Sequence, residues 1–74
     1  MNNTRRNQIN RIITRLETIQ TEVEEILSDE QEYNENIPEN MLDGQNAENS
    51  NYAIDYLEQI DVEDVLESLR EASA

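Results

Sequence analysis

The sequence contains no cysteine, no histidine and no lysine, and its 74 residues include one glycine, one proline and three aromatic residues, all tyrosine. Without cysteine and histidine, the chain lacks the usual zinc ligands, a thiol nucleophile and an imidazole base. No apolar run approaches the roughly 18 residues of a membrane-spanning helix. Residues 1–10 hold no apolar signal core behind their arginines. We therefore expect a cytoplasmic protein with no membrane partner and no cofactor.

Most of the charged residues in the sequence are acidic. Eighteen acidic residues stand against five basic ones, for a formal net charge of −13. Because nucleic acid would repel a surface of that sign, we expect no direct nucleic acid binding. A chain of this length buries too little apolar surface for a deep core unless copies associate. Carboxylate acid–base catalysis needs a concave, partly desolvated site, so we expect no catalytic residues.

The two strongest helix breakers, Pro38 and Gly44, lie six positions apart near the chain centre. They predict an all-α fold, a single antiparallel helical hairpin that resembles a coiled coil. The expected helices cover about residues 4–34 and 47–72, and the connector covers about residues 35–46. Pro38 is expected to open one short turn within the connector.

The apolar residues of the first predicted helix repeat every seven positions. Ile9, Leu16 and Val23 form one row, and the next row is Ile12, Ile19 and Ile26, flanked by Ile13 and Leu27. This spacing predicts a coiled-coil seam. Two helices bury only the seam between them, so we predict self-association into a helical bundle, most simply a dimer. The expected contacts are Ile9, Ile12, Ile13, Leu16, Ile19, Val23, Ile26, Leu57, Leu66 and Leu69.

The second predicted helix has a less regular apolar stripe. The stripe begins at Ala53, Ile54 and Leu57 and continues one position out of register at Val62, Val65, Leu66, Leu69 and Ala72. Such an offset either changes the winding of one helix or marks a separate final helix capped by Asp61. We favour one continuous helix. Its N-cap is expected at Asn46 or Asn49, and that of the first helix at Asn3 or Thr4.

Basic residues gather at one end of the chain. The only charged residues in positions 1–16 are Arg5, Arg6, Arg11 and Arg15, whereas positions 59–74 carry five acids and Arg70. An antiparallel hairpin places these two stretches side by side, so we expect the arginines to pair across the helices or between subunits. As an alternative, the four arginines bind phosphate, because Arg11 and Arg15 share a helix face.

The remaining positions, 17–58, hold thirteen acids, no base and all three tyrosines. Along the first helix the acids recur about every 3.5 Å, close to the ~3.4 Å charge spacing of one DNA strand. Glutamate-rich faces also serve simply to solubilise helices. We predict that this half binds a basic host protein, such as a nuclease, by mimicking DNA. The predicted contacts are Glu24, Glu25, Glu32, Tyr33, Glu35, Glu39, Asp43, Tyr52 and Tyr56.

The stretch from Glu39 to Ser50 has a superficial likeness to a calcium-binding loop. It contains Asp43 followed by Gly44, but Met41 occupies a required ligand position and Ser50 replaces the closing glutamate. We therefore expect no metal site.

Three segments carry a resemblance to known proteins: Asp29–Glu32, Asn36–Met41 and Ala53–Glu58. Through them the chain resembles small hypothetical proteins of phages and prophages of Gram-positive bacteria, over roughly residues 9–72. The resemblance implies a counter-defence role in the host cytoplasm, as an anti-CRISPR or anti-restriction inhibitor. Two alternatives stay open. One is an oligomeric sponge that binds a signalling nucleotide through Arg5, Arg6, Arg11 and Arg15, and the other is a purely structural bundle.

Overall fold

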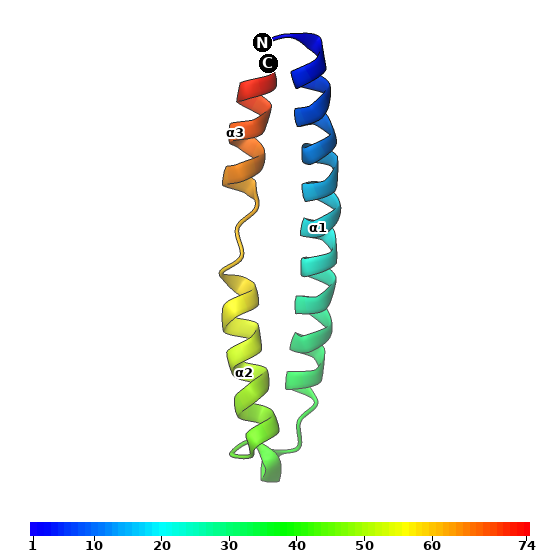
Figure 1. Cartoon of the computed structure of the whole chain (residues 1–74). Coiled ribbons are helices and arrows are strands. Elements are labelled where there is room, and N and C mark those ends of the chain that lie inside the picture. The colour runs from blue at the N-terminus through cyan, green and yellow to red at the C-terminus, as the bar shows by residue number, and fades with distance from the viewer. The chain divides into compact units, whose positions relative to one another are not determined.

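The computed structural model describes all residues, 1–74, and contains helices and turns but no strand. The elements in chain order are α1 (Asn3–Glu35), the 3₁₀ turn η1 (Glu39–Met41), α2 (Gln45–Glu58) and α3 (Glu63–Ser73) (Figure 1). The prediction of an all-α helical hairpin is confirmed. The chain divides into two compact units. We call Val23–Ile60 the loop unit, and Met1–Glu22 together with Asp61–Ala74 the terminal unit.

Helix α1 begins and ends close to the predicted positions. At its start the Asn2 side-chain oxygen accepts a hydrogen bond from the Arg5 backbone N–H at 2.9 Å, so the cap lies one residue before the predicted Asn3 or Thr4. At its end the Asn36 side chain donates to the Glu32 carbonyl at 2.9 Å and satisfies a terminal acceptor. Pro38 restricts the residue before it to extended backbone, so the helix cannot continue.

The connector forms the short turn expected after Pro38. In η1 the Met41 N–H donates to the Pro38 carbonyl at 2.8 Å. Gly44 then stands at the N-cap of α2, where an added Cβ would lie only 3.1 Å from the Met41 carbonyl oxygen. No side chain caps α2. The predicted caps Asn46 and Asn49 lie inside the helix instead, because α2 already begins at Gln45.

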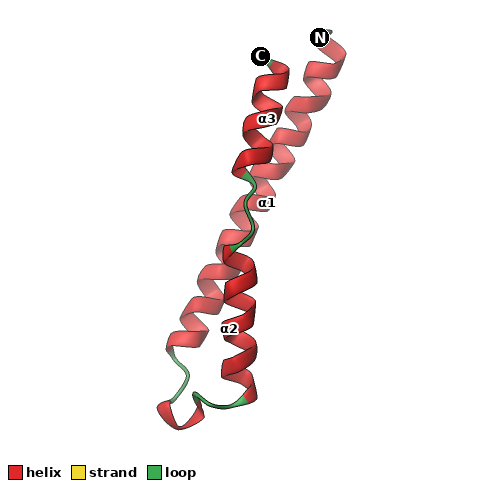
Figure 2. Cartoon of the chain, turned by 90° about the vertical axis from the view of Figure 1, so that its left-hand side faces the viewer, coloured by secondary structure: helices red, strands yellow, loops and turns green.

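The predicted continuous second helix is wrong. Residues 59–62 are not helical and separate α2 from α3, as Figure 2 shows. The Asp61 carboxylate accepts a hydrogen bond from the Glu63 backbone N–H at 3.0 Å and holds the chain in a turn just before α3. The one-position offset in the apolar stripe therefore marks a helix break, as the alternative predicted, although the N-cap of α3 is Val62 and not Asp61.

Within the loop unit, α2 runs antiparallel to the end of α1 (Figure 1) and contacts it through small residues. Ala47 and Ser50 are each only 2% exposed. The Asn34 side-chain amide donates to Ser50 Oγ at 3.1 Å and to Asn51 Oδ1 at 2.8 Å. Gln31 donates to the Glu58 carboxylate at 3.4 Å. Amide hydrogen bonds thus accompany the apolar contacts of this unit, in which Leu27, Ile54 and Leu57 are half-buried.

Within the terminal unit, α3 packs on the first part of α1 through larger apolar residues. Leu66 is fully buried, at 0% exposure. Ile9, Ile13 and Leu16 of α1 are half-buried. Gln20 closes this face by donating to the Glu63 carboxylate at 3.0 Å. A conventional apolar contact therefore forms the core of the terminal unit.

The predicted coiled-coil seam is right for one row and wrong for the other. The partly buried residues of α1 are Arg6, Ile9, Ile13, Leu16, Gln20, Val23, Leu27, Glu30 and Asn34. Ile12, Ile19 and Ile26 are instead 42%, 46% and 56% exposed. The second row on the inner face includes Gln20 and Asn34, which form hydrogen bonds to residues of the opposite helices. The apolar heptad pattern does not reveal such polar residues, so it assigned Ile12, Ile19 and Ile26 to the inner face in their place. Among the other expected self-association contacts, Leu66 is enclosed within the chain, and Leu57 and Leu69 are half-buried.

Candidate functional site

The two units differ in how their charges are balanced. The loop unit carries eleven carboxylates and no basic residue, whereas the terminal unit carries seven carboxylates and all five arginines. Ten of the eleven Asp and Glu side chains in the loop unit are exposed, and the eleventh, Glu30, is half-buried. The single ion pair of the structure, between Arg70 Nη1 and Glu63 Oε2 at 3.9 Å, lies in the terminal unit. The exposed carboxylates of the loop unit therefore have no basic partner within the chain, and among them Glu58 accepts a hydrogen bond from Gln31.

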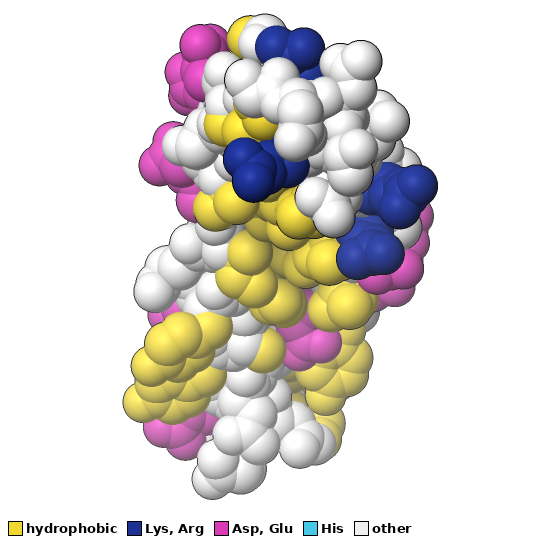
Figure 3. Space-filling model, turned by 45° about the horizontal axis from the view of Figure 1, so that its top comes forward, with side chains coloured by type: hydrophobic (Ala, Val, Ile, Leu, Met, Phe, Trp, Pro, Cys, Tyr) yellow, Lys and Arg dark blue, Asp and Glu magenta, His cyan; other side chains and the backbone are white.

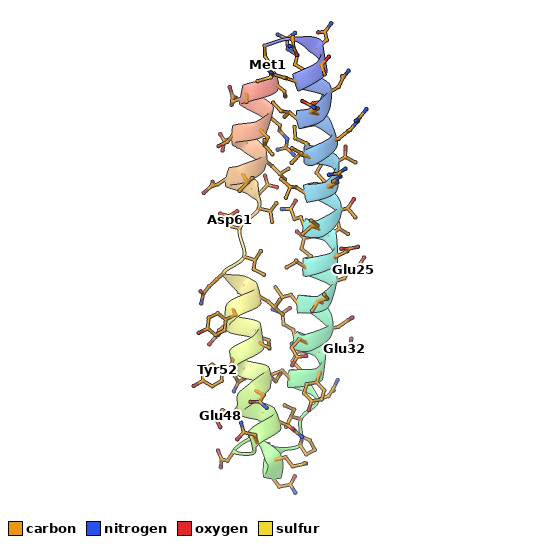
Figure 4. The ribbon with its side chains drawn as sticks, viewed as in Figure 1. Met1, Glu25, Glu32, Glu48, Tyr52 and Asp61 are labelled. Carbon is orange, nitrogen blue, oxygen red and sulfur yellow. The ribbon has the colours of Figure 1, made fainter.

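Four of the predicted contact residues lie on the outer surface of α1. Glu24, Glu25, Glu32 and Glu35 are exposed. Figure 4 shows that Glu25 and Glu32 point away from α2. Val23, Leu27 and Asn34 are half-buried on the side of α1 that faces α2. The glutamates fall at other positions of the helical repeat and therefore lie outside that side. The carboxylates thus form one acidic helix face.

The connector surrounds a hollow that the sequence did not predict. Its volume is about 530 Å³. The lining residues are Tyr33, Asn36, Ile37, Pro38, Asn40, Met41, Asp43, Gly44, Gln45 and Asn46. The apolar members come from the end of α1 and from the turn at Pro38, and one carboxylate, Asp43, lies among them. A mainly apolar hollow therefore lies in the same unit as the acidic helix face, and Glu39 lies in the η1 turn that forms part of its wall.

The three tyrosines, all predicted contacts of the partner, do not lie on one surface. Tyr33 lines the hollow at the connector. Tyr52 and Tyr56 are exposed on α2, and Tyr52 points away from α1 (Figure 4). Ala47 and Ser50 fix the inner face of α2, and both tyrosines lie about half a turn from that face. The candidate site therefore contains Tyr33, while Tyr52 and Tyr56 belong to a separate surface.

No protein-family model, curated protein or solved structure matches this chain. The resemblance to phage proteins stays a prediction, and function is argued from the surface described above. No group of three carboxylates is placed to hold a metal ion. No helix has the length and apolar character that a membrane span requires.

Of the two predicted pairings of the N-terminal arginines, the one across the helices is wrong, and the one between subunits stays a prediction. Arg5, Arg6, Arg11 and Arg15 form no ion pair. The side of α1 that meets α3 is built from Ile9, Ile13, Leu16 and Gln20, so Arg11 and Arg15 lie outside the contact. Figure 3 shows arginine side chains (dark blue) on the surface of the terminal unit. Arg11 and Arg15 line a shallow hollow with Asn10 and Thr14, and phosphate binding there stays a prediction.

Proposed function

We propose that this chain is a non-enzymatic inhibitor that docks its loop unit on the basic DNA-binding surface of a host defence protein. A CRISPR nuclease or a restriction enzyme is the kind of target that we expect. One observation carries the proposal: the loop unit holds eleven carboxylates, no basic residue and no ion pair. The counter-defence setting rests on the resemblance to small phage proteins.

Electrostatic attraction supplies the recognition. Uncompensated charge of this density repels itself and opposes the compact state, so a basic partner that neutralises it gains free energy. Complementary charge also accelerates encounter, and its effect falls as salt rises. Along α1 the carboxylates repeat at about the axial spacing of phosphates in one DNA strand. A groove shaped for DNA accepts the same pattern of negative charge, and DNA is excluded while the inhibitor is bound.

The hollow at the connector supplies the apolar anchor. Its apolar wall, made by Tyr33, Ile37, Pro38 and Met41, suits the aliphatic stem of an arginine from the partner. The guanidinium of that arginine would lie over the Tyr33 ring or pair with the Asp43 carboxylate. Buried contacts of this kind dominate binding energy, while charges at the rim chiefly set association rate and specificity.

The test measures DNA cleavage by a panel of purified restriction enzymes and CRISPR nucleases at several salt concentrations. We expect the chain to inhibit at least one enzyme and to inhibit it less as salt rises. A quadruple variant with Glu24→Gln, Glu25→Gln, Glu32→Gln and Glu35→Gln should inhibit about tenfold less strongly, because four exposed charges at about 0.35 kcal/mol each contribute about 1.4 kcal/mol in total.

A matched control removes the same number of charges from the terminal unit. It carries Glu17→Gln, Asp64→Asn, Glu67→Gln and Glu71→Gln, all at exposed positions. The control should inhibit as strongly as the original chain. Equal weakening by both variants would show that overall charge, not the loop unit, governs binding. Inhibition that is indifferent to salt would contradict DNA mimicry.

A further inference from the structure

Three isoleucines form an uncovered row along α1. Ile12, Ile19 and Ile26 are 42%, 46% and 56% exposed, although isoleucine is among the side chains most often buried. They recur every seven residues in one continuous α-helix, so they lie on the same side of it. The residues that contact α2 and α3 form a neighbouring row. The exposed row is therefore a second heptad seam with no partner within the chain.

The charges of α1 indicate what covers this seam. Positions 3–16 hold four arginines and no acid, and positions 17–35 hold eight acids and no base. Arg15, Glu22 and Asp29 each follow an isoleucine of the row by three residues and therefore flank it. None of these side chains forms an ion pair within the chain. Two copies of α1 placed antiparallel would bring the basic stretch of each against the acidic stretch of the other, whereas parallel copies would oppose like charges.

We propose that α1 pairs with α1 of a second copy, antiparallel, through Ile12, Ile19 and Ile26. Such a pair has twofold symmetry and uses the same patch twice, as closed dimers do. The isoleucines of the two copies interdigitate, and the N-terminal arginines gain carboxylate partners that they lack within one chain. Glu24, Glu25 and Glu32 lie on a different side of α1 from the isoleucines, so the apolar contact does not bury them, and the pairing does not depend on the proposed function.

The first test is the mass of the protein in solution, by sedimentation and native mass spectrometry at micromolar concentration. The original chain should have twice the mass of one 8.7 kDa chain. Ile19→Glu should have the mass of one chain and keep its helical circular dichroism, because Ile19 does not contribute to the inner face. Val65→Glu is the matched control, since Val65 is 50% exposed on α3 and outside the row, and this variant should stay dimeric. A monomeric original chain, or a dimer that survives Ile19→Glu, overturns the proposal.

The second test is the orientation of the two helices. The chain has no cysteine, so Gln8→Cys and Asp29→Cys each introduce a single thiol beside the isoleucine row. In an antiparallel pair the two positions approach each other across the interface. A short thiol-specific crosslinker should therefore link a mixture of the two variants and leave each variant alone unlinked. Efficient linking of either variant alone, or failure of the mixture to link, overturns the antiparallel arrangement.

Discussion

The terminal unit and the loop unit use the same helix, α1, and differ in what they pack against it. The terminal unit buries Leu66 against branched apolar residues and has a charge close to neutral. The loop unit meets α1 through Ala47 and Ser50, relies on amide hydrogen bonds and carries most of the net charge. The comparison teaches that one helix can support two differently built contacts, an apolar one beside a nearly neutral surface and a more polar one beside an acidic surface. In our proposal, the acidic surface of the loop unit is the one that binds a partner.

The largest effect that we predict tests the source of cohesion. Leu66→Ala removes the one large side chain that is fully buried and should lower the free energy of unfolding by about 2–5 kcal/mol. For a chain this short, that loss is comparable to the total stability. Urea denaturation followed by circular dichroism measures it. Val65→Ala, at the exposed neighbouring position, should change stability by less than about 0.5 kcal/mol. Equal effects of the two variants would contradict the assigned core.

A smaller effect is expected from the polar contact of the loop unit. Asn34→Ala removes the hydrogen bonds to Ser50 and Asn51 and leaves the buried Ser50 hydroxyl without its donor. The cost should be about 1–3 kcal/mol. Hydrogen exchange should show faster opening of α2 than of α3. Asn40→Ala, an exposed asparagine that forms no hydrogen bond, is the control and should leave exchange unchanged. If hydrogen exchange became equally faster in α2 and α3, the contact of Asn34 would not stabilise the loop unit specifically.

The smallest effect that we predict comes from removing repulsion between carboxylates on α1, and it raises the free energy of unfolding. The quadruple glutamine variant of the loop unit, described above, removes several like-charge pairs three or four residues apart on α1. Each pair costs about 0.2–0.5 kcal/mol, so the variant should be about 1 kcal/mol more stable at low salt. Added salt should reduce this gain by screening. The quadruple variant of the terminal unit should gain less, and an equal gain would mean that charge is not concentrated in the loop unit.

The positions of α1 and of the connector follow from a few residues and were therefore predictable, whereas the break between α2 and α3 was not predicted. Pro38 and Gly44 mark the connector, and the heptad spacing of Ile9, Leu16 and Val23 identifies the inner face of α1. The acidic face of α1 was also recognisable, because Glu24, Glu25 and Glu32 fall outside that spacing. Local rules suffice for such features because each depends on residues within one helix.

The features that sequence reasoning missed depend on contacts between distant residues. Gln20 and Asn34 occupy the inner face because each bonds to a residue on the opposite helix, and no periodicity of apolar residues reveals that. The hollow arises only when the turn at Pro38 meets the start of α2. The available hint was the presence of the apolar residues Ile37, Met41 and Leu42 in a connector that is otherwise mostly polar. Tyr52 was grouped with Tyr33 because both are near the connector in sequence, while their orientations depend on helix packing.

Residues 59–62 are not helical, so we expect the chain to tolerate an inserted residue there, whereas we expect an insertion within α1 to disrupt the packing. An extra residue inside α1 would rotate every later side chain by about 100° and carry inner positions to the outside. An extra residue between α2 and α3 is absorbed by a link that already lacks helical geometry. Insertions and deletions during evolution should therefore accumulate in this link, where tags or reporter groups can also be introduced with little harm.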